Sequence, residues 1–161
     1  MAVDVRSALD IDRPRAEVAA FAGDPDNAPR WYSNIRQVNW RSPRPLAIGS
    51  RIEFVAEFLG RRLVYTYEVE QWVPGERLAM ATVEGPFPMR TTYAWTDAGS
   101  GGTMMELRNE GRPSGFQSTA APLMALAMKR ENRKDLRRLK GLLESRRMTR
   151  ALHERARVVS P

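Results

Sequence analysis

Apolar and polar positions alternate over most of the first 111 residues, with the period of two that is typical of β-strands. Residues 51–59 show the alternation clearly, with Phe54 and Phe58 on one face and Glu57 on the other. Runs of this kind, separated by turns rich in Gly and Pro, predict strands over 3–11, 35–41, 51–59, 62–73, 77–84, 89–96 and 103–109. The pattern therefore predicts seven strands, and the short turns from the second strand onward indicate antiparallel pairing.

The segment between the first two strands has the signals of two short helices. Asp12 and Pro14 supply a cap and a first-turn proline, and Gly23 ends that helix. A second Asp-Pro pair at 24–25 starts the next helix, which runs towards Trp31. Helices this short cannot form a core by themselves, so we expect them to pack against the sheet.

The hydrophobic period changes from 2 to 3.6 in the last third of the chain. Ser118 or Thr119 is the expected cap of a long helix, whose apolar positions recur at three- and four-residue spacing. This periodicity fades after about Arg146, so we expect the helix to end there. The predicted organisation is a single ligand-binding domain over residues 1–146, followed by a frayed basic tail over residues 147–161.

A sheet with one apolar face must be covered, and the final helix is the only predicted element long enough to do so. The predicted fold class is therefore α+β, with a seven-stranded antiparallel sheet curled around a long C-terminal helix. Two short helices lie between strands 1 and 2. A single helix rarely fills a curled sheet of this width, so we expect an internal cavity between them.

Composition limits the chemistry of the chain. The chain has 161 residues, no cysteine and a single histidine, His153, which lies in the predicted tail. These counts exclude a thiol nucleophile and argue against a Ser-His-Asp triad or a multi-histidine zinc site. We expect no metal and no cofactor. No apolar run reaches about 18 residues and no leader pattern opens the chain, so we expect a cytoplasmic protein.

The positive charge is concentrated at the C-terminal end. Residues 1–128 carry a net charge of −1, whereas residues 129–161 carry +8. This excess indicates either a solvated helix face or a surface that contacts anionic partners. No aromatic residue follows Phe116, which argues against nucleic-acid binding. The segment 120–128 is apolar nearly all round, so a transient membrane contact or a homodimer interface stays open beside a plain monomer.

The candidate ligand-binding residues are the aromatic, methionine, leucine and amide side chains expected to face the long helix. Asn109 and Asn132 are the most informative, because each interrupts an otherwise apolar face. A buried amide needs a partner, which would be the other asparagine, the backbone, water or a ligand. Plain core packing is the alternative for each apolar member of the set. The twelve candidates are Phe54, Phe58, Tyr67, Met80, Tyr93, Trp95, Met105, Leu107, Asn109, Met124, Met128 and Asn132.

The order of elements carries several short motifs at fixed places. They are Asp24-Pro25-Asp26-Asn27 with Trp31, Gly49-Ser50-Arg51, Val73-Pro74-Gly75-Glu76-Arg77-Leu78, Gly102-Thr103, and the terminal helix with Leu136, Leu139 and Leu143. In this order they resemble the START/birch-pollen-allergen-like (SRPBCC) superfamily, and within it the polyketide cyclase/dehydrase and lipid-transport group. The resemblance covers residues 2–145. It implies the helix-grip fold and a hydrophobic ligand cavity, and it carries over no catalytic residue.

Three functions compete at this point. The first is binding or transport of a small hydrophobic ligand, such as a lipid, isoprenoid or polyketide, in the cavity. The second is a polyketide cyclase/dehydrase-type enzyme without a metal, which would use the same cavity to fold a reactive substrate. The third is an interaction module that acts through the basic C-terminal helix, and whose binding would fall steeply with salt.

Overall fold

Seven antiparallel strands form one sheet in the computed structural model, which describes residues 2–113 and 119–158. The strands are β1 (Val3–Ile11), β2 (Ile35–Trp40), β3 (Arg51–Phe58), β4 (Arg61–Val73), β5 (Arg77–Glu84), β6 (Met89–Asp97) and β7 (Thr103–Gly111). Their order in the sheet is β1-β7-β6-β5-β4-β3-β2. Each strand from β2 to β7 thus pairs with its neighbour in sequence, and β1 completes the other edge. The predicted seven-stranded antiparallel sheet is confirmed.

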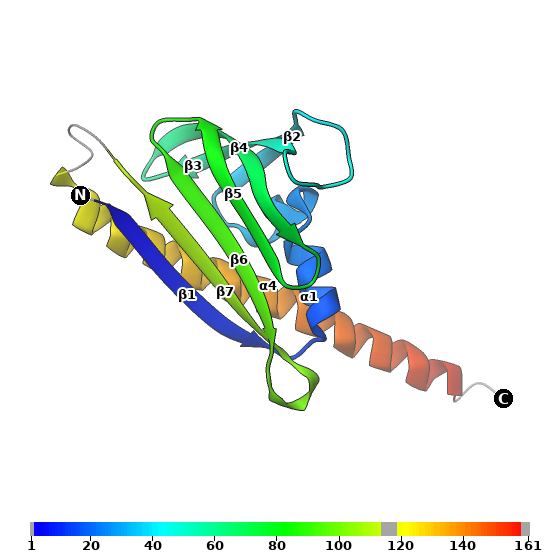
Figure 1. Cartoon of the computed structure of the whole chain (residues 1–161). Helices are drawn as coiled ribbons and strands as arrows, with labels where there is room; N and C mark the ends of the chain where they lie inside the picture. Colours follow the sequence, from blue (N-terminus) through cyan, green and yellow to red (C-terminus); the bar gives the residue numbers. More distant parts are fainter. Residues whose placement is uncertain (1, 114–118, 159–161) are drawn as a thin grey trace.

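Short helices join β1 to β2, as the sequence predicts. They are α1 (Arg15–Ala22), a 3-10 helix (Pro25–Asn27) and α2 (Ala28–Trp31), and a further 3-10 turn (Gly99–Gly101) joins β6 to β7. Asp24 caps the first 3-10 helix, since its side chain accepts a hydrogen bond from the Asp26 backbone N–H at 3.0 Å. The remaining helix, α4 (Ala121–Val158), runs along the sheet and continues past α1 (Figure 1).

Helix α4 is longer than the sequence pattern predicts. It continues to Val158 instead of ending near Arg146, while the predicted cap at Ser118 lies outside the described residues. The segment 144–158 has no Gly or Pro and is rich in Arg, Ala, Met, Leu and Glu, which favour helix even where no core is buried. Within residues 2–113 and 119–158, no helix combines the length and the apolar character needed to cross a membrane.

The middle of α4 anchors the helix to the sheet. Leu136, Leu139 and Leu143 are at most 3% exposed, and they share one core cluster with Ile11 of β1 and Trp31 of α2. Burying a side chain of this size contributes about 1.5–3 kcal/mol. The predicted apolar stripe therefore fixes both the position of α4 and the face of the sheet that it covers.

The sheet curls around this helix, and three interruptions of strand pairing help it to do so. The register shifts once in the pairing of β2 with β3, between Ile35 and Gln37. It shifts twice in the pairing of β4 with β5, between Thr66 and Tyr67 and between Val69 and Gln71. Bulges of this kind bend a strand and increase its local twist. Figure 1 shows β2 and β3 lying away from the α4 axis, at the opposite side of the sheet from β1 and β7.

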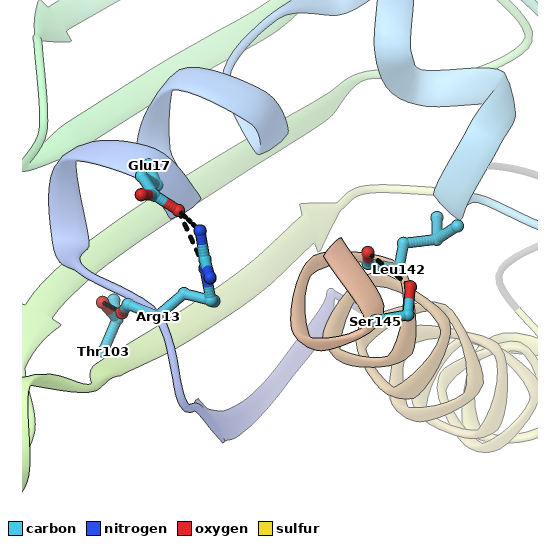
Figure 2. A network of polar contacts seen from close by, with 5 residues as sticks. All are labelled: Arg13, Glu17, Thr103, Leu142 and Ser145. Atoms are coloured by element: carbon cyan, nitrogen blue, oxygen red, sulfur yellow. Dashed lines mark hydrogen bonds and ion pairs between the residues drawn. The ribbon is translucent and has the colours of Figure 1, made fainter. Parts of the chain in front are cut away.

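A polar junction holds α1 at the end of β1. The buried Thr103 hydroxyl of β7 donates to the backbone oxygen of Arg13 at 2.7 Å, and the Arg13 guanidinium pairs with Glu17 of α1 (Figure 2). In the same view, Ser145 on α4 donates to the backbone oxygen of Leu142. The junction ties the chain leaving β1 to the neighbouring strand, so α1 starts from a fixed point.

Candidate functional site

A cavity of about 120 Å³ lies between the inner face of the sheet and the N-terminal half of α4. Every strand from β2 to β7 contributes to its wall, together with α4 and two loops. The side chains that line it are Tyr32, Asn34, Ile35, Phe54, Ala56, Phe58, Leu63, Tyr65, Tyr67, Met80, Phe87, Met89, Thr91, Tyr93, Asn109, Met124, Met128, Glu131, Asn132 and Asp135. For comparison, a dry apolar cavity of about 150 Å³ can hold benzene.

Nine of the twelve candidate residues line this cavity. They are Phe54, Phe58, Tyr67, Met80, Tyr93, Asn109, Met124, Met128 and Asn132. Alternation predicted the face of the candidates on β3, β6 and β7, and three- and four-residue spacing predicted the helix members, whereas the alternation of residues 62–73 was ambiguous and Tyr67 was placed inward by choice. Whether these side chains contact a ligand stays a prediction.

The other three candidates do not line the cavity. Trp95, Met105 and Leu107 are at most 1% exposed and pack in the core cluster that contains Leu136 and Leu139. They lie on the predicted face of the sheet, but at the end where α4 packs directly against it. The structure therefore places these three residues in the core, outside the lining of this cavity, and their contact with a ligand stays a prediction.

Aromatic rings form much of the sheet side of the cavity. The ring of Phe54 meets that of Tyr67 edge to face at 5.7 Å between centroids, and Tyr65 meets Phe87 in the same way at 6.1 Å. Edge-to-face pairs of this kind fix ring orientation as well as burying apolar area. Phe87 comes from the loop between β5 and β6, so this loop closes one side of the cavity.

Two phenol hydroxyls meet at the α2 end of the cavity. The Tyr32 and Tyr93 oxygens are 2.6 Å apart, and either can donate. Burial raises the pKa of both phenols well above the ordinary value of about 10. Burial also raises the pKa of Tyr67 to about 12. All three phenols are therefore protonated at neutral pH and are poorly suited to act as bases. Within the Tyr32–Tyr93 pair one hydroxyl donates to the other, so one hydrogen of the pair is left to donate elsewhere.

A chain of side-chain hydrogen bonds crosses from the sheet to α4. The Thr91 hydroxyl donates to Asn109 Oδ1 at 2.8 Å, and Asn109 Nδ2 donates to Asn132 Oδ1 at 3.2 Å. The two asparagines singled out in the sequence are therefore partners of each other. Asn132 Nδ2 is buried and has no partner within the described part of the chain.

The charged side chains in the cavity wall are acidic. Glu131 and Asp135 lie one helical turn apart on α4, and both face Ser33. The Ser33 backbone N–H donates to Asp135 Oδ1 at 2.9 Å, and the Ser33 hydroxyl donates to Glu131 Oε2 at 2.9 Å. Among the described residues, no lysine or arginine lines the cavity.

Burial dominates the electrostatics of Asp135. The residue is 1% exposed, and loss of hydration raises the pKa of its carboxyl group from 3.8 to about 6, against the opposing effect of the Ser33 hydrogen bonds. Nearby Glu131 raises the pKa further and Lys134 lowers it. A carboxyl group in this range can exchange a proton near neutral pH.

Several lining residues were missed by the sequence analysis. Asn34 lies in the irregular connection after α2, where no periodicity indicates which side chains point inward. Glu131 and Asp135 carried a usable signal, because they fall on the same helix face as Met128 and Asn132. Within the described ranges, no group of three His, Asp or Glu side chains is close enough to hold a metal ion.

The comparisons with known proteins agree on one fold. Residues 2–144 match the family model for polyketide cyclase / dehydrase and lipid transport. A comparison with curated proteins finds no match in sequence. Each solved structure below is less than 25% identical in sequence, so the likeness concerns the fold alone.

Among solved structures, the chain is similar to TTHA0849 from Thermus thermophilus, with a TM-score of 0.75 and 20% identity over 86% of this chain and 94% of that one. It is also similar to the Zhui aromatase/cyclase from Streptomyces sp. R1128, with a TM-score of 0.75 and 15% identity over 91% and 96% of the two chains. A START superfamily protein from Mycobacterium smegmatis gives a TM-score of 0.62 and 14% identity over 83% and 97%.

Proposed function

The chain belongs to the polyketide cyclase/dehydrase and lipid transport family, and from this premise we propose that it binds a small hydrophobic molecule in the cavity between the sheet and α4. The observation that carries the proposal is the composition of the cavity wall. Aromatic and methionine side chains from β3 to β6 and α4 surround a space that they do not fill. A few polar groups interrupt the apolar wall, as in small-molecule sites generally.

The volume of the cavity limits the size of the bound group. About 120 Å³ suits a single ring or a short alkyl segment. A lipid, isoprenoid or polyketide of greater length would place one such segment inside and extend the rest towards solvent, or would require α4 and the Phe87 loop to separate. We favour a ligand whose buried part has the size of one ring.

The first test is native mass spectrometry of gently purified protein, followed by denaturing extraction and identification of the released molecules. A stoichiometric apolar adduct supports the proposal and gives its chemical class. The matched variants are Ala56→Ile, which fills the cavity from β3, and Ala94→Ile, which adds the same volume on the outer face of β6. The adduct should be lost in the first variant and kept in the second. Equal retention in both would contradict the cavity as the binding site.

A cyclase/dehydrase-type activity is the second candidate, because the same cavity holds groups suited to proton transfer. Burial raises the pKa of the Asp135 carboxyl group to about 6, and one hydroxyl of the Tyr32–Tyr93 pair keeps a hydrogen that it can donate to a substrate carbonyl. Incubation with a panel of linear poly-β-ketone thioesters tests this candidate by product analysis. Turnover that Asp135→Asn abolishes in a folded protein would support it. Binding without turnover would leave the carrier function alone.

A further inference from the structure

The polar end of the cavity contains a hydrogen-bond donor with no acceptor. Asn132 is 5% exposed and lines the cavity, and its Nδ2 has no partner within the described residues. Two hydrogen bonds fix the orientation of its amide group: Thr91 donates to Asn109, and Asn109 donates to Asn132 Oδ1. The direction of this chain uses Asn132 Oδ1 as an acceptor and leaves the Asn132 amide N–H without an acceptor at the cavity wall. A buried donor without an acceptor is costly, so a bound molecule that supplies an acceptor is favoured here.

A hydrogen-bond acceptor lies three residues further along the same helix. Residues at this spacing share one face of a helix, with Cβ atoms about 5–6 Å apart. Asp135 lines the cavity beside Asn132 and accepts the Ser33 backbone N–H at 2.9 Å. A carboxylate has about four acceptor positions, so this bond leaves capacity for a donor from a ligand.

We propose that the ligand carries an uncharged hydroxyl group that accepts a hydrogen bond from Asn132 Nδ2 and donates one to the Asp135 carboxylate. This inference rests on the proposed function, because it specifies the ligand of the same cavity. The apolar body of the ligand then lies against the aromatic wall formed by Phe54, Phe58 and Phe87. The recognised class is a phenol or a hydrophobic alcohol whose ring or chain fits the cavity.

Other head groups satisfy the two positions less well. A hydrocarbon leaves both unpaired, and a ketone has no hydrogen for Asp135. An ammonium group has no lone pair for Asn132. A carboxylate or phosphate meets Glu131 and Asp135 with no basic side chain in the described wall to compensate. A hydroxyl group is the smallest group that both donates and accepts.

The test compares four single-ring probes that differ only in the polar group, measured by calorimetry or ligand-observed NMR at pH 7.5 on the full chain. The probes are p-cresol, p-xylene, p-toluate and p-methylbenzylamine. We expect p-cresol to bind about tenfold tighter than p-xylene, which corresponds to roughly one good hydrogen bond. We expect p-toluate and p-methylbenzylamine to bind more weakly than p-cresol. Binding of p-xylene as tight as that of p-cresol, or tighter binding of either charged probe, would overturn the inference and leave the proposed function intact. Absence of binding by all four would overturn both.

Two variants test whether the preference for p-cresol over p-xylene comes from the Asn132 N–H. Asn132→Leu keeps the size of the side chain but removes the donor, and Thr91→Val removes the first link of the chain that orients it. In both, the affinity for p-cresol should fall towards that for p-xylene, while the affinity for p-xylene changes less than about twofold. Asn39→Leu, on β2 where Asn39 donates to Glu53, is the matched control and should keep the full difference. An unchanged preference for p-cresol in Asn132→Leu would overturn the assignment of the donor.

Discussion

Replacing Asp135 with asparagine tests how much free energy of unfolding the protein loses by burying an ionised carboxylate in the cavity wall. Asp135 is 1% exposed, and its pKa is raised from 3.8 to about 6 mainly by loss of hydration. A pKa raised in the folded state means that the folded protein binds the proton more tightly than the unfolded chain does. Its stabilising contribution is therefore complete below pH 3.8 and is lost as the pH rises towards 6. Above pH 6 the folded protein carries the ionised carboxylate at a cost.

The size of this cost follows from the two pKa values. A rise from 3.8 to about 6 corresponds to about 3 kcal/mol of free energy of unfolding. Most of it, about 2 kcal/mol, is lost between about pH 4 and pH 7. The asparagine side chain cannot ionise, but its amide oxygen can still accept the Ser33 N–H. We therefore expect Asp135→Asn to gain about 2 kcal/mol relative to the wild type between about pH 4 and pH 7.

Urea denaturation followed by tryptophan fluorescence measures this difference at pH 4, 5, 6, 7 and 8. With a slope of about 1–3 kcal/mol per molar urea, the midpoint of the variant should move by roughly 1 M relative to the wild type across this range. Asp10→Asn, on the exposed side of β1, controls for the loss of one negative charge. Parallel curves for the wild type and Asp135→Asn at every pH would refute the reasoning, because they would show that Asp135 keeps its ordinary pKa in the folded protein.

Three other changes test the packing around the cavity. Leu136→Ala leaves a space at a buried position of α4 that packs in the core, and it should lower the free energy of unfolding by about 2–5 kcal/mol in urea titrations; a loss below about 1 kcal/mol would contradict its place in the core. Gly85→Ala adds a Cβ atom 2.5 Å from Tyr65 Cδ1, at a residue whose φ is +156°. It should displace the Tyr65 ring and change the near-UV circular dichroism spectrum. An unchanged spectrum together with an unchanged melting temperature would argue against this contact. Thr103→Val removes the hydroxyl that donates to the Arg13 backbone oxygen and should cost about 1–3 kcal/mol of the free energy of unfolding, whereas Thr103→Ser keeps the hydroxyl and should cost less; a Thr103→Val protein as stable as the wild type would contradict a contribution of this hydrogen bond.

The sheet was predictable because each strand carries its own evidence. Alternation assigns the faces of β3, and short turns such as 74–76 between β4 and β5 place successive strands side by side in antiparallel order. The end of α4 was not predictable in the same way. Apolar periodicity reports burial, so it stops with Leu143, whereas the helix itself continues on intrinsic propensity to Val158. A helix that leaves the body of the protein gives no amphipathic signal.

The sequence predicts which face of the sheet the cavity lies on, but not how far along each strand it extends. Alternation places Tyr93 and Trp95 on the same side of β6, yet Tyr93 lines the cavity and Trp95 is core. Their fates differ because α4 packs against one end of the sheet and leaves space at the other. That distance depends on the curl of the whole sheet, which no single strand encodes. Asn34, in the connection after α2, was missed for a related reason, since irregular backbone has no period.

The part of α4 up to Asp135 lines the cavity with several polar side chains, whereas the part from Leu136 onward packs in the apolar core. Leu136, Leu139 and Leu143 stabilise the fold by burying apolar area. Asp135 is buried next to Leu136, but its carboxyl group adds no apolar contact to the core and loses its hydration. A hydrophobic side chain at 135 would avoid the cost of desolvation, although the Ser33 N–H would lose the acceptor that Asp135 provides. A buried carboxyl group lowers the stability of the fold, and a buried amide without a partner does the same. Destabilising polar groups that lie close together are typical of sites that bind a ligand. The desolvation of Asp135 and the unpaired donor of Asn132 therefore support the same end of the cavity as the place where the polar group of the ligand binds.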